Sequence, residues 1–160
     1  VRAAVGPDFP VILRWSQWKQ QDFSARLVTS PAELEQFLLP LSAAGVDIFH
    51  CSTRRFWEPE FAGSDLNLAG WTRKITGKPA ITVGSVGLNM DFIPAPGESA
   101  FRAAEPASLD ELVRRAAAEE FDLVAVGRAL IANPDWVRLV AAKRPGDIKA
   151  FHVEMLDSLA

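Results

Sequence analysis

The chain has 160 residues, of which 49% are hydrophobic, and its formal net charge is -3. This length predicts one sizeable core and hence one domain. The interspersed charges exclude a basic stripe for nucleic acid, and no apolar stretch is long enough to span a bilayer. We therefore expect neither nucleic acid nor a membrane as a partner.

The single cysteine, Cys51, excludes an internal disulfide. The first residues also lack the charged-then-apolar layout of a signal peptide, so the sequence favours a cytoplasmic protein. The chain begins at Val1 without an initiator methionine, in what is predicted to be the tail of a helix that ends in a turn at 6–8. We therefore expect the sequence to start inside a longer protein.

Short apolar runs alternate with helical patterns along the chain, which predicts βαβ units and a parallel sheet. Strands are predicted at 10–15, 46–52, 78–85 and 121–128. Their near-continuous hydrophobicity is typical of strands that are covered on both faces. Four such units fit either a small open sheet or half of an eight-stranded barrel, because a whole barrel needs about 250 residues.

Helices are predicted between these strands from their start and stop signals. The signals are capping boxes at Ser30 with Glu33 and at Ser108 with Glu111, and terminal glycines at Gly45 and Gly77.

The strongest local signal is VGRALIANPDW at 126–136. A buried strand ends at Gly127, Arg128 follows at once, and Asn133 and Pro134 are predicted to start a new helix. Barrels often bind phosphate at such strand ends, where a glycine exposes backbone N–H groups and a short helix points its N-terminus inward. Arg128 would add a charge-assisted clamp to this phosphate site.

The preceding strand end, ITVGSVGLN at 81–89, supplies Gly84 and Gly87 as further exposed backbone donors. Two adjacent strand ends of this kind are more specific for phosphate than one. The alternative is that the glycines only make tight turns and that Arg128 pairs with a surface carboxylate.

Three motifs in this order resemble the last four strands of the Old Yellow Enzyme family: LRWS at 13–16, TVGSVG at 82–87 and VGRALIANPDW at 126–136. The resemblance spans nearly the whole chain. It implies an α/β fold that is the C-terminal half of a (β/α)8 TIM barrel, with four parallel strands and helices, in which residues 1–160 are a single partial domain. Members of the family bind FMN and reduce activated C=C bonds of enones with NADH or NADPH.

The resemblance also implies six FMN-binding residues: an arginine beside the flavin ring, a valine that lines the flavin, and four residues at the phosphate. In that order they are Arg14, Val86, and then Gly87, Leu88, Gly127 and Arg128.

The family's catalytic residues have no counterpart in this sequence. Its proton-donating Tyr and its substrate-binding His/Asn or His/His pair lie on strand four, which would precede Val1, and the chain contains no Tyr. We therefore assign no catalytic residue and expect the isolated chain to be inactive. The implied partners are the missing N-terminal half-barrel and a small-molecule enone, while the sequence leaves homo-oligomerisation open.

Two other interpretations stay open. The glycine-rich strand ends fit any phosphate-binding TIM-barrel enzyme, including another FMN-dependent dehydrogenase or a sugar-phosphate enzyme. The chain also fits a half-barrel fragment that has no activity without its N-terminal half.

The remaining candidate residues have competing explanations. On their strand, His50 is expected as a satisfied core residue and Cys51 as a packed, inert thiol, and His152 is expected at the surface. No metal ligands are assigned. The segment after the second predicted strand has two possible roles. It either shapes access to the pocket or forms a loop that is salt-bridged to Glu58 and Glu60. Its residues are Arg54, Arg55, Phe56 and Trp57. The aromatic residues that fit either pocket lining or loop packing are Trp15, Trp18 and Phe92.

Overall fold

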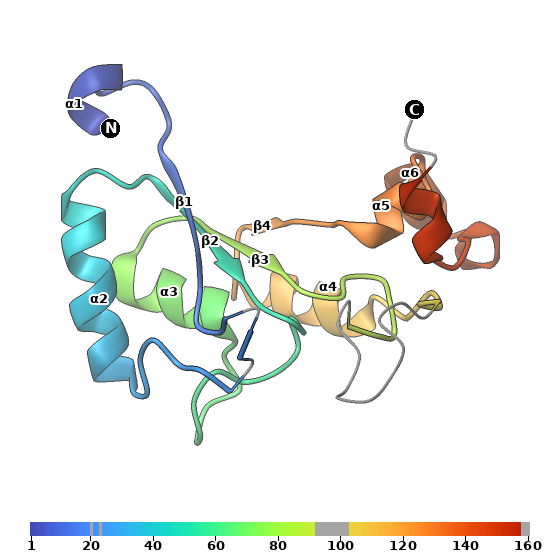
Figure 1. The fold of residues 1–160 in the computed structure, drawn as a ribbon, viewed down its shortest axis with the longest axis horizontal. Coiled ribbons are helices and arrows are strands. Elements are labelled where there is room, and N and C mark those ends of the chain that lie inside the picture. Colours follow the sequence, from blue (N-terminus) through green and yellow to red (C-terminus); the bar gives the residue numbers. More distant parts are fainter. Residues whose placement is uncertain (20, 23, 92–102, 158–160) are drawn as a thin grey trace.

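A parallel sheet forms the centre of the chain in the computed structural model, which describes residues 1–19, 21–22, 24–91 and 103–157 (Figure 1). Its strands are β1 Ile12–Ser16, β2 Ile48–Ser52, β3 Ala80–Val83 and β4 Leu123–Val124. They form a four-stranded sheet in the order β1-β2-β3-β4, and every neighbouring pair is parallel. Each strand overlaps its predicted segment. The predicted α/β fold with four parallel strands and helices is therefore confirmed.

The helices that connect the strands, as the alternating pattern predicts, are α2 Pro31–Ala43, α3 Leu68–Thr76 and α4 Asp110–Ala117. Helix α1 Arg2–Val5 precedes β1. After β4 come α5 Arg128–Ala132 and α6 Trp136–Ala141, with 3-10 turns at Pro145–Asp147 and Val153–Leu156. Helix α1 ends at Gly6 with a φ of 81°, which confirms the predicted helix tail and turn. Within the described ranges, no helix combines the length and the apolar character that a membrane crossing would require.

Helix α2 begins where the first capping box predicts. The Ser30 hydroxyl accepts the backbone N–H of Glu33 at 3.3 Å. The Glu33 carboxylate, however, accepts the backbone N–H of Thr29 at 2.6 Å, one residue before the N-cap. The predicted stop signal of the next helix is also present, because Gly77 ends α3 in the left-handed conformation with a φ of 64°.

The second capping box is a wrong prediction. Helix α4 has Leu109 as its N-cap, and Ser108 accepts the N–H of Asp110 at 3.1 Å instead of that of Glu111. The Glu111 carboxylate pairs with Arg114 at 2.7 Å and with Arg115 at 2.6 Å. Two charge-assisted hydrogen bonds to arginines are stronger than one bond to a backbone N–H, so Glu111 does not turn back to cap the helix.

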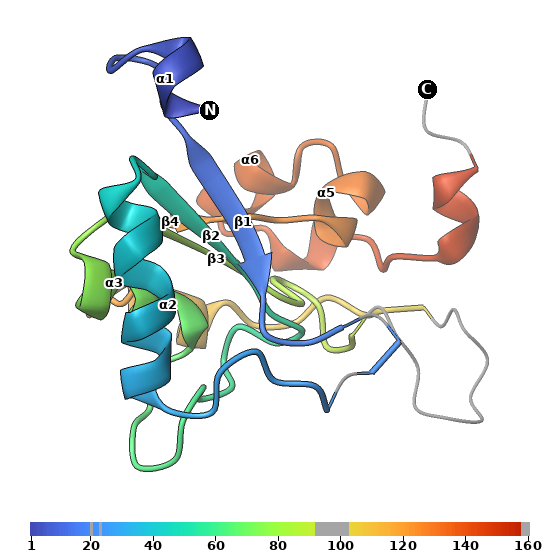
Figure 2. The same cartoon turned by 60° about the vertical axis from the view of Figure 1, so that its left-hand side comes forward.

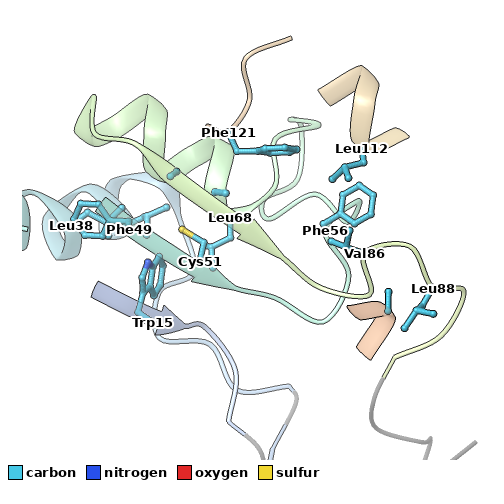
Figure 3. Close-up of a cluster of buried hydrophobic side chains, with 14 of the residues drawn as sticks. Trp15, Leu38, Phe49, Cys51, Phe56, Leu68, Val86, Leu88, Leu112 and Phe121 are labelled. Carbon is cyan, nitrogen blue, oxygen red and sulfur yellow. The ribbon is translucent and has the colours of Figure 1, made fainter. Parts of the chain in front are cut away.

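The hydrophobic core lies on one face of the sheet. Phe49 and Cys51 of β2 are fully buried. Helices α2 and α3 lie side by side on one side of the sheet (Figure 2). Figure 3 shows the same cluster, with Trp15, Leu38 and Leu68 packed around these two side chains. Ala80 and Thr82 continue the buried face on β3. The helices thus supply the apolar cover for the buried residues of β1, β2 and β3.

The other face of the sheet is open, which corrects the expectation that both faces are covered. Ile12 of β1 is 53% exposed and Leu123 of β4 is 50% exposed. The crossover helices α2 and α3 pack on the opposite face, so they cannot bury these side chains. Strands β1 and β4 also form the two edges of the sheet. Apolar residues on an open face and at unpaired edges favour association with further protein.

Candidate functional site

A cavity of about 430 Å³ lies where the strands end. Loops from all four strand ends contribute to its lining, which includes Trp18, Thr53, Arg54, Ser85, Asp91 and Arg128. The carboxyl ends of parallel strands are the usual location of ligand sites in α/β folds. The cavity is therefore the candidate functional site.

Four of the six predicted FMN-binding residues line this cavity: Val86, Leu88, Gly127 and Arg128. Gly87 lies beside it and lines a neighbouring hollow with Phe56 and Trp57. The positive φ of Gly87, 71°, and its approach to the Trp136 ring leave little space for a side chain, since a Cβ would come within 3.0 Å of that ring.

The remaining predicted residue, Arg14, does not line the cavity. It is partnered with His50 on β2, and its guanidinium donates to the Ser52 hydroxyl at 3.3 Å. Side chains alternate along a strand, so Arg14 and Ser16 both point to the open face of the sheet. Ser16 is paired with Ser52, and Ser52 with Val83, so these three residues form the next row of side chains on that face. Val83 lines the cavity. Arg14 therefore lies on the same face as the cavity, one row of side chains below it.

Arg128 is held at the cavity by the loop after β3. It is the first residue of α5, and Gly127 is the N-cap. Its guanidinium donates to the Met90 carbonyl at 2.6 Å and to the Ser85 hydroxyl at 3.4 Å. Burial lowers the pKa of Arg128 and the nearby carboxylate of Asp91 opposes this shift, but an arginine stays charged at neutral pH. The side chain is thus a fixed positive charge at the cavity wall.

Two strand-end glycines shape the cavity in different ways. Gly84 has a φ of 137°, and a Cβ there would come within 2.8 Å of the Thr53 carbonyl oxygen, so the end of β3 packs directly on the loop after β2. A Cβ on Gly127 would meet nothing within 4 Å. The backbone of Gly127 therefore faces open space, beside the first turn of α5, where helix N–H groups have no intrahelical partner.

An ion-pair cluster that the sequence analysis missed adjoins Arg128. The Asp91 side chain is only 6% exposed, and its two oxygens pair with Arg54 at 2.6 Å and with Arg55 at 2.8 Å. Arg55 also pairs with Glu58 at 2.6 Å. The available signal was an acidic residue in an apolar segment directly after the strand-end glycines, but nothing in the sequence connects that residue to the two arginines.

The loop after β2 combines both predicted roles. Arg54 lines the cavity, while Arg55 pairs with Glu58 as in a salt-bridged loop. Glu60 does not join these pairs. It accepts a hydrogen bond from Gln17 at 2.8 Å, and burial raises the pKa of its carboxyl group. Phe56 is buried and stacks edge-on against Trp57 at 5.2 Å.

The predicted aromatic residues divide in the same way. Trp15 is 8% exposed and packs on Phe37 with ring centroids 5.2 Å apart, so it belongs to the core. Trp18 lines the cavity. Phe92 lies outside the described residues.

Cys51 and His50 have no catalytic arrangement. The Cys51 thiol donates to the Thr72 hydroxyl at 3.3 Å, and burial raises its pKa to about 12, so it is the packed, inert thiol that the sequence predicts. His50 is not satisfied as expected, because its buried Nε2 has no hydrogen-bond partner among the described residues. Burial, followed by the charge of Arg14, lowers the pKa of His50. His152 is exposed, as expected.

Metal ligation finds no support in the residues that the structure describes. No three His, Cys, Asp or Glu side chains among them gather in a way that could hold a metal ion. The charged residues at the cavity are instead two arginines and one aspartate, namely Arg54, Arg128 and Asp91. A site with this excess of guanidinium groups is suited to an anionic ligand.

The fold recurs within a larger enzyme. In the structure of histamine dehydrogenase from Rhizobium sp. 4-9, a region matches 92% of this chain with a TM-score of 0.54 and 20% sequence identity. The chain is also 27% identical over 157 residues to an NADH oxidase of Thermoanaerobacter brockii, in an alignment that covers 93% of the chain. No family model matches the sequence. The chain spans about a fifth of each relative, namely 19% of the first and 20% of the second.

Proposed function

We propose that this chain is the FMN-binding part of an oxidoreductase that uses NADH or NADPH as reductant. The observation that carries the proposal is the cavity at the strand ends, with the Arg128 guanidinium and the open Gly127 backbone side by side. Both relatives carry the names of oxidoreductases, and the name of one includes NADH. These names support the reaction class, and the site geometry supports a phosphate-bearing cofactor.

The residues present fit a flavin mononucleotide. Arg128 would bind the phosphate through charge-assisted hydrogen bonds, and Gly127 would let the phosphate approach the first turn of α5. Val86 and Leu88 give the cavity an apolar wall, and Gly87 would donate its backbone N–H beside them. Arg14, on the open face below, would bring positive charge toward the flavin ring. When bound, the flavin supplies hydride transfer, and these residues bind and orient it.

The finer activity in this proposal is reduction of activated C=C bonds of enones. It rests on the resemblance of the strand-end motifs to the Old Yellow Enzyme family. That family takes its proton from a Tyr, and this chain contains none. The proposal therefore includes an N-terminal half-barrel as the partner that supplies the proton donor, and it includes inactivity of the isolated chain. The exposed Ile12 and Leu123 on the open face support such a partner.

A second candidate is another phosphate-binding barrel enzyme. It is favoured by the position of Arg14, which does not line the cavity although the flavin mapping assigns it to the ring. A sugar-phosphate enzyme would need the same Arg128 and Gly127 but no ring contact.

One preparation of the full-length protein distinguishes these candidates. Flavin oxidoreductase function predicts a visible flavin spectrum, FMN in the released cofactor, and bleaching of that spectrum when NADH or NADPH is added without oxygen. Subsequent addition of an enone should restore the oxidised spectrum. A protein that holds no flavin after reconstitution with FMN would contradict the proposal and favour the second candidate. Reoxidation by oxygen but not by enones would contradict only the finer activity.

A further inference from the structure

The carboxylate of Asp91 lies between positive charges at the cavity. Arg54 contacts it directly at 2.6 Å. Burial lowers the pKa of Arg128, and the negative charge of Asp91 opposes this lowering. All three side chains line the cavity. Two guanidinium groups that line one cavity form the kind of arrangement in which proteins bind phosphate.

The two oxygens of Asp91 have separate partners. Oδ2 pairs with Nη2 of Arg54, whereas Oδ1 pairs with Nε of Arg55 at 2.8 Å. Arg55 is absent from the cavity lining, and its other ion pair is to Glu58. If Arg54 turned toward a ligand, Asp91 would keep the ion pair with Arg55. The carboxylate would therefore not be left as an unpaired buried charge, whose cost would oppose the exchange.

The side chains of Arg54 and Asp91 differ in their freedom to move. The side chain of Arg54 is 29% exposed and that of Asp91 is 6% exposed. A partly exposed arginine on a long aliphatic stem can change rotamer, while the short buried aspartate stays in place. The exchange between the two states therefore moves the side chain of Arg54 and leaves Asp91 in place.

We propose that Arg54 is a second phosphate-binding side chain of this cavity and that Asp91 is a built-in competitor, which holds Arg54 until a phosphate monoester arrives. This inference rests on the proposed function and extends it to a residue outside the flavin-binding set. A phosphate monoester carries about two negative charges at neutral pH. Arg54 and Arg128 match that charge, and the Asp91 carboxylate opposes it. Asp91 thus lowers the affinity for every phosphate ligand and makes binding depend on displacement of the Arg54–Asp91 ion pair.

The test compares FMN with riboflavin, which has the same ring and ribityl chain but no phosphate. The full-length protein is stripped of flavin, and both ligands are titrated by flavin fluorescence. Arg54→Gln should weaken FMN binding roughly tenfold or more, the scale of one lost charge-assisted hydrogen bond, and leave riboflavin binding unchanged. Arg54→Lys should retain most of the FMN affinity. Arg138→Gln, which removes one exposed positive charge on α6, is the matched control and should change neither.

Asp91→Asn should have the opposite effect. Removing the competing carboxylate should tighten FMN binding several-fold and again leave riboflavin binding unchanged. A folding defect would weaken both ligands in every variant, so opposite shifts from Arg54→Gln and Asp91→Asn cannot come from misfolding. The inference is overturned if Arg54→Gln leaves FMN affinity unchanged, if it weakens both flavins equally, or if Asp91→Asn weakens FMN binding.

Titration with inorganic phosphate separates this inference from the proposed function. The protein could bind neither flavin and still bind phosphate, with an affinity that falls in Arg54→Gln and rises in Asp91→Asn. That result would support the anion site and contradict the flavin function. If the protein binds flavin but neither variant changes the binding of FMN or of phosphate, the flavin function is supported and the role of Arg54 and Asp91 is contradicted. Absence of both phosphate and flavin binding would contradict both proposals.

Discussion

Gly84 shows how a single residue links the sequence to the shape of the site. Its backbone has a φ of 137°, and a Cβ would come within 2.8 Å of the Thr53 carbonyl oxygen. We predict that Gly84→Ala destabilises the protein by about 1 to 3 kcal/mol, because it combines backbone strain with a steric clash against backbone. Gly146→Ala is the control, since a Cβ there meets nothing within 4 Å. Chemical denaturation measures both, and equal stability of the two variants would contradict this role.

Cys51 gives a prediction about pH. Burial raises the pKa of its thiol from 9.0 to about 12. The unfolded chain ionises first as pH rises, so the contribution of this group to stability is complete below pH 9.0, decreases above it and is lost at about pH 12. At neutral pH the folded protein should resist alkylation at Cys51 and react only after unfolding. Mass spectrometry after iodoacetamide treatment measures this, and rapid labelling of the folded protein would refute it.

Residue types at the strand ends predicted part of the site. Gly127 and Arg128 could be identified because a buried strand that ends in glycine and arginine has a known relation to phosphate. Asp91 could not be identified, because its partners Arg54 and Arg55 lie far from it in sequence and meet it only when two loops fold together. Arg14, in contrast, was identified from the sequence together with its strand. Its distance from the cavity could not be predicted, because it depends on the register of β1 against β2.

Asn67 is the N-cap of α3. It is fully buried, its carbonyl accepts the N–H of Gly70 at 2.9 Å, and its amide donates to the Phe56 carbonyl at 2.7 Å. We predict that Asn67→Ala destabilises the protein by about 2 to 3 kcal/mol, because buried partners lose their hydrogen bonds. Ser30→Ala removes only the partly exposed cap of α2 and should cost about 1 kcal/mol. Thermal unfolding of the two variants tests this order, and the reverse order would contradict it.

The helices show which local signals determine an element and which do not. Helix α2 starts at its predicted cap, where the Ser30 hydroxyl accepts the backbone N–H of Glu33 at 3.3 Å. Helix α4 starts later because Glu111 has two arginines on its own helix within reach. Capping motifs in sequence thus predict a helix well, but they predict its first residue only where no stronger partner competes for the capping side chain.

The open face of the sheet leads to a prediction for the whole molecule. Residues 1–160 produced alone should associate with increasing concentration, since Ile12 and Leu123 expose apolar surface at the two sheet edges. Leu123→Lys should reduce this association, while Val137→Lys, at an exposed position on α6, should not. Sedimentation velocity measures both variants. A monodisperse monomer at all concentrations would contradict the role of this face.

The alternation of strands and helices predicted the parallel sheet, but hydrophobicity alone did not show that one face is open. An apolar strand looks the same in sequence whether its second face is covered by helices of the same segment or by protein from elsewhere. That information lies in the packing of α2 and α3, which both use the same face of the sheet (Figure 2).

In the proposed function, Arg128 and the Gly127 backbone bind the phosphate of FMN, and a comparison of FMN with riboflavin tests this role. Dissociation constants of FMN and riboflavin are measured for the full-length protein and for its Arg128→Ala variant. We predict a loss of about 1.5 to 3 kcal/mol in FMN binding, the scale of a lost charge-assisted hydrogen bond, and no change for riboflavin. Unchanged FMN affinity in the variant, or an equal loss for both flavins, would contradict a role of Arg128 in phosphate binding.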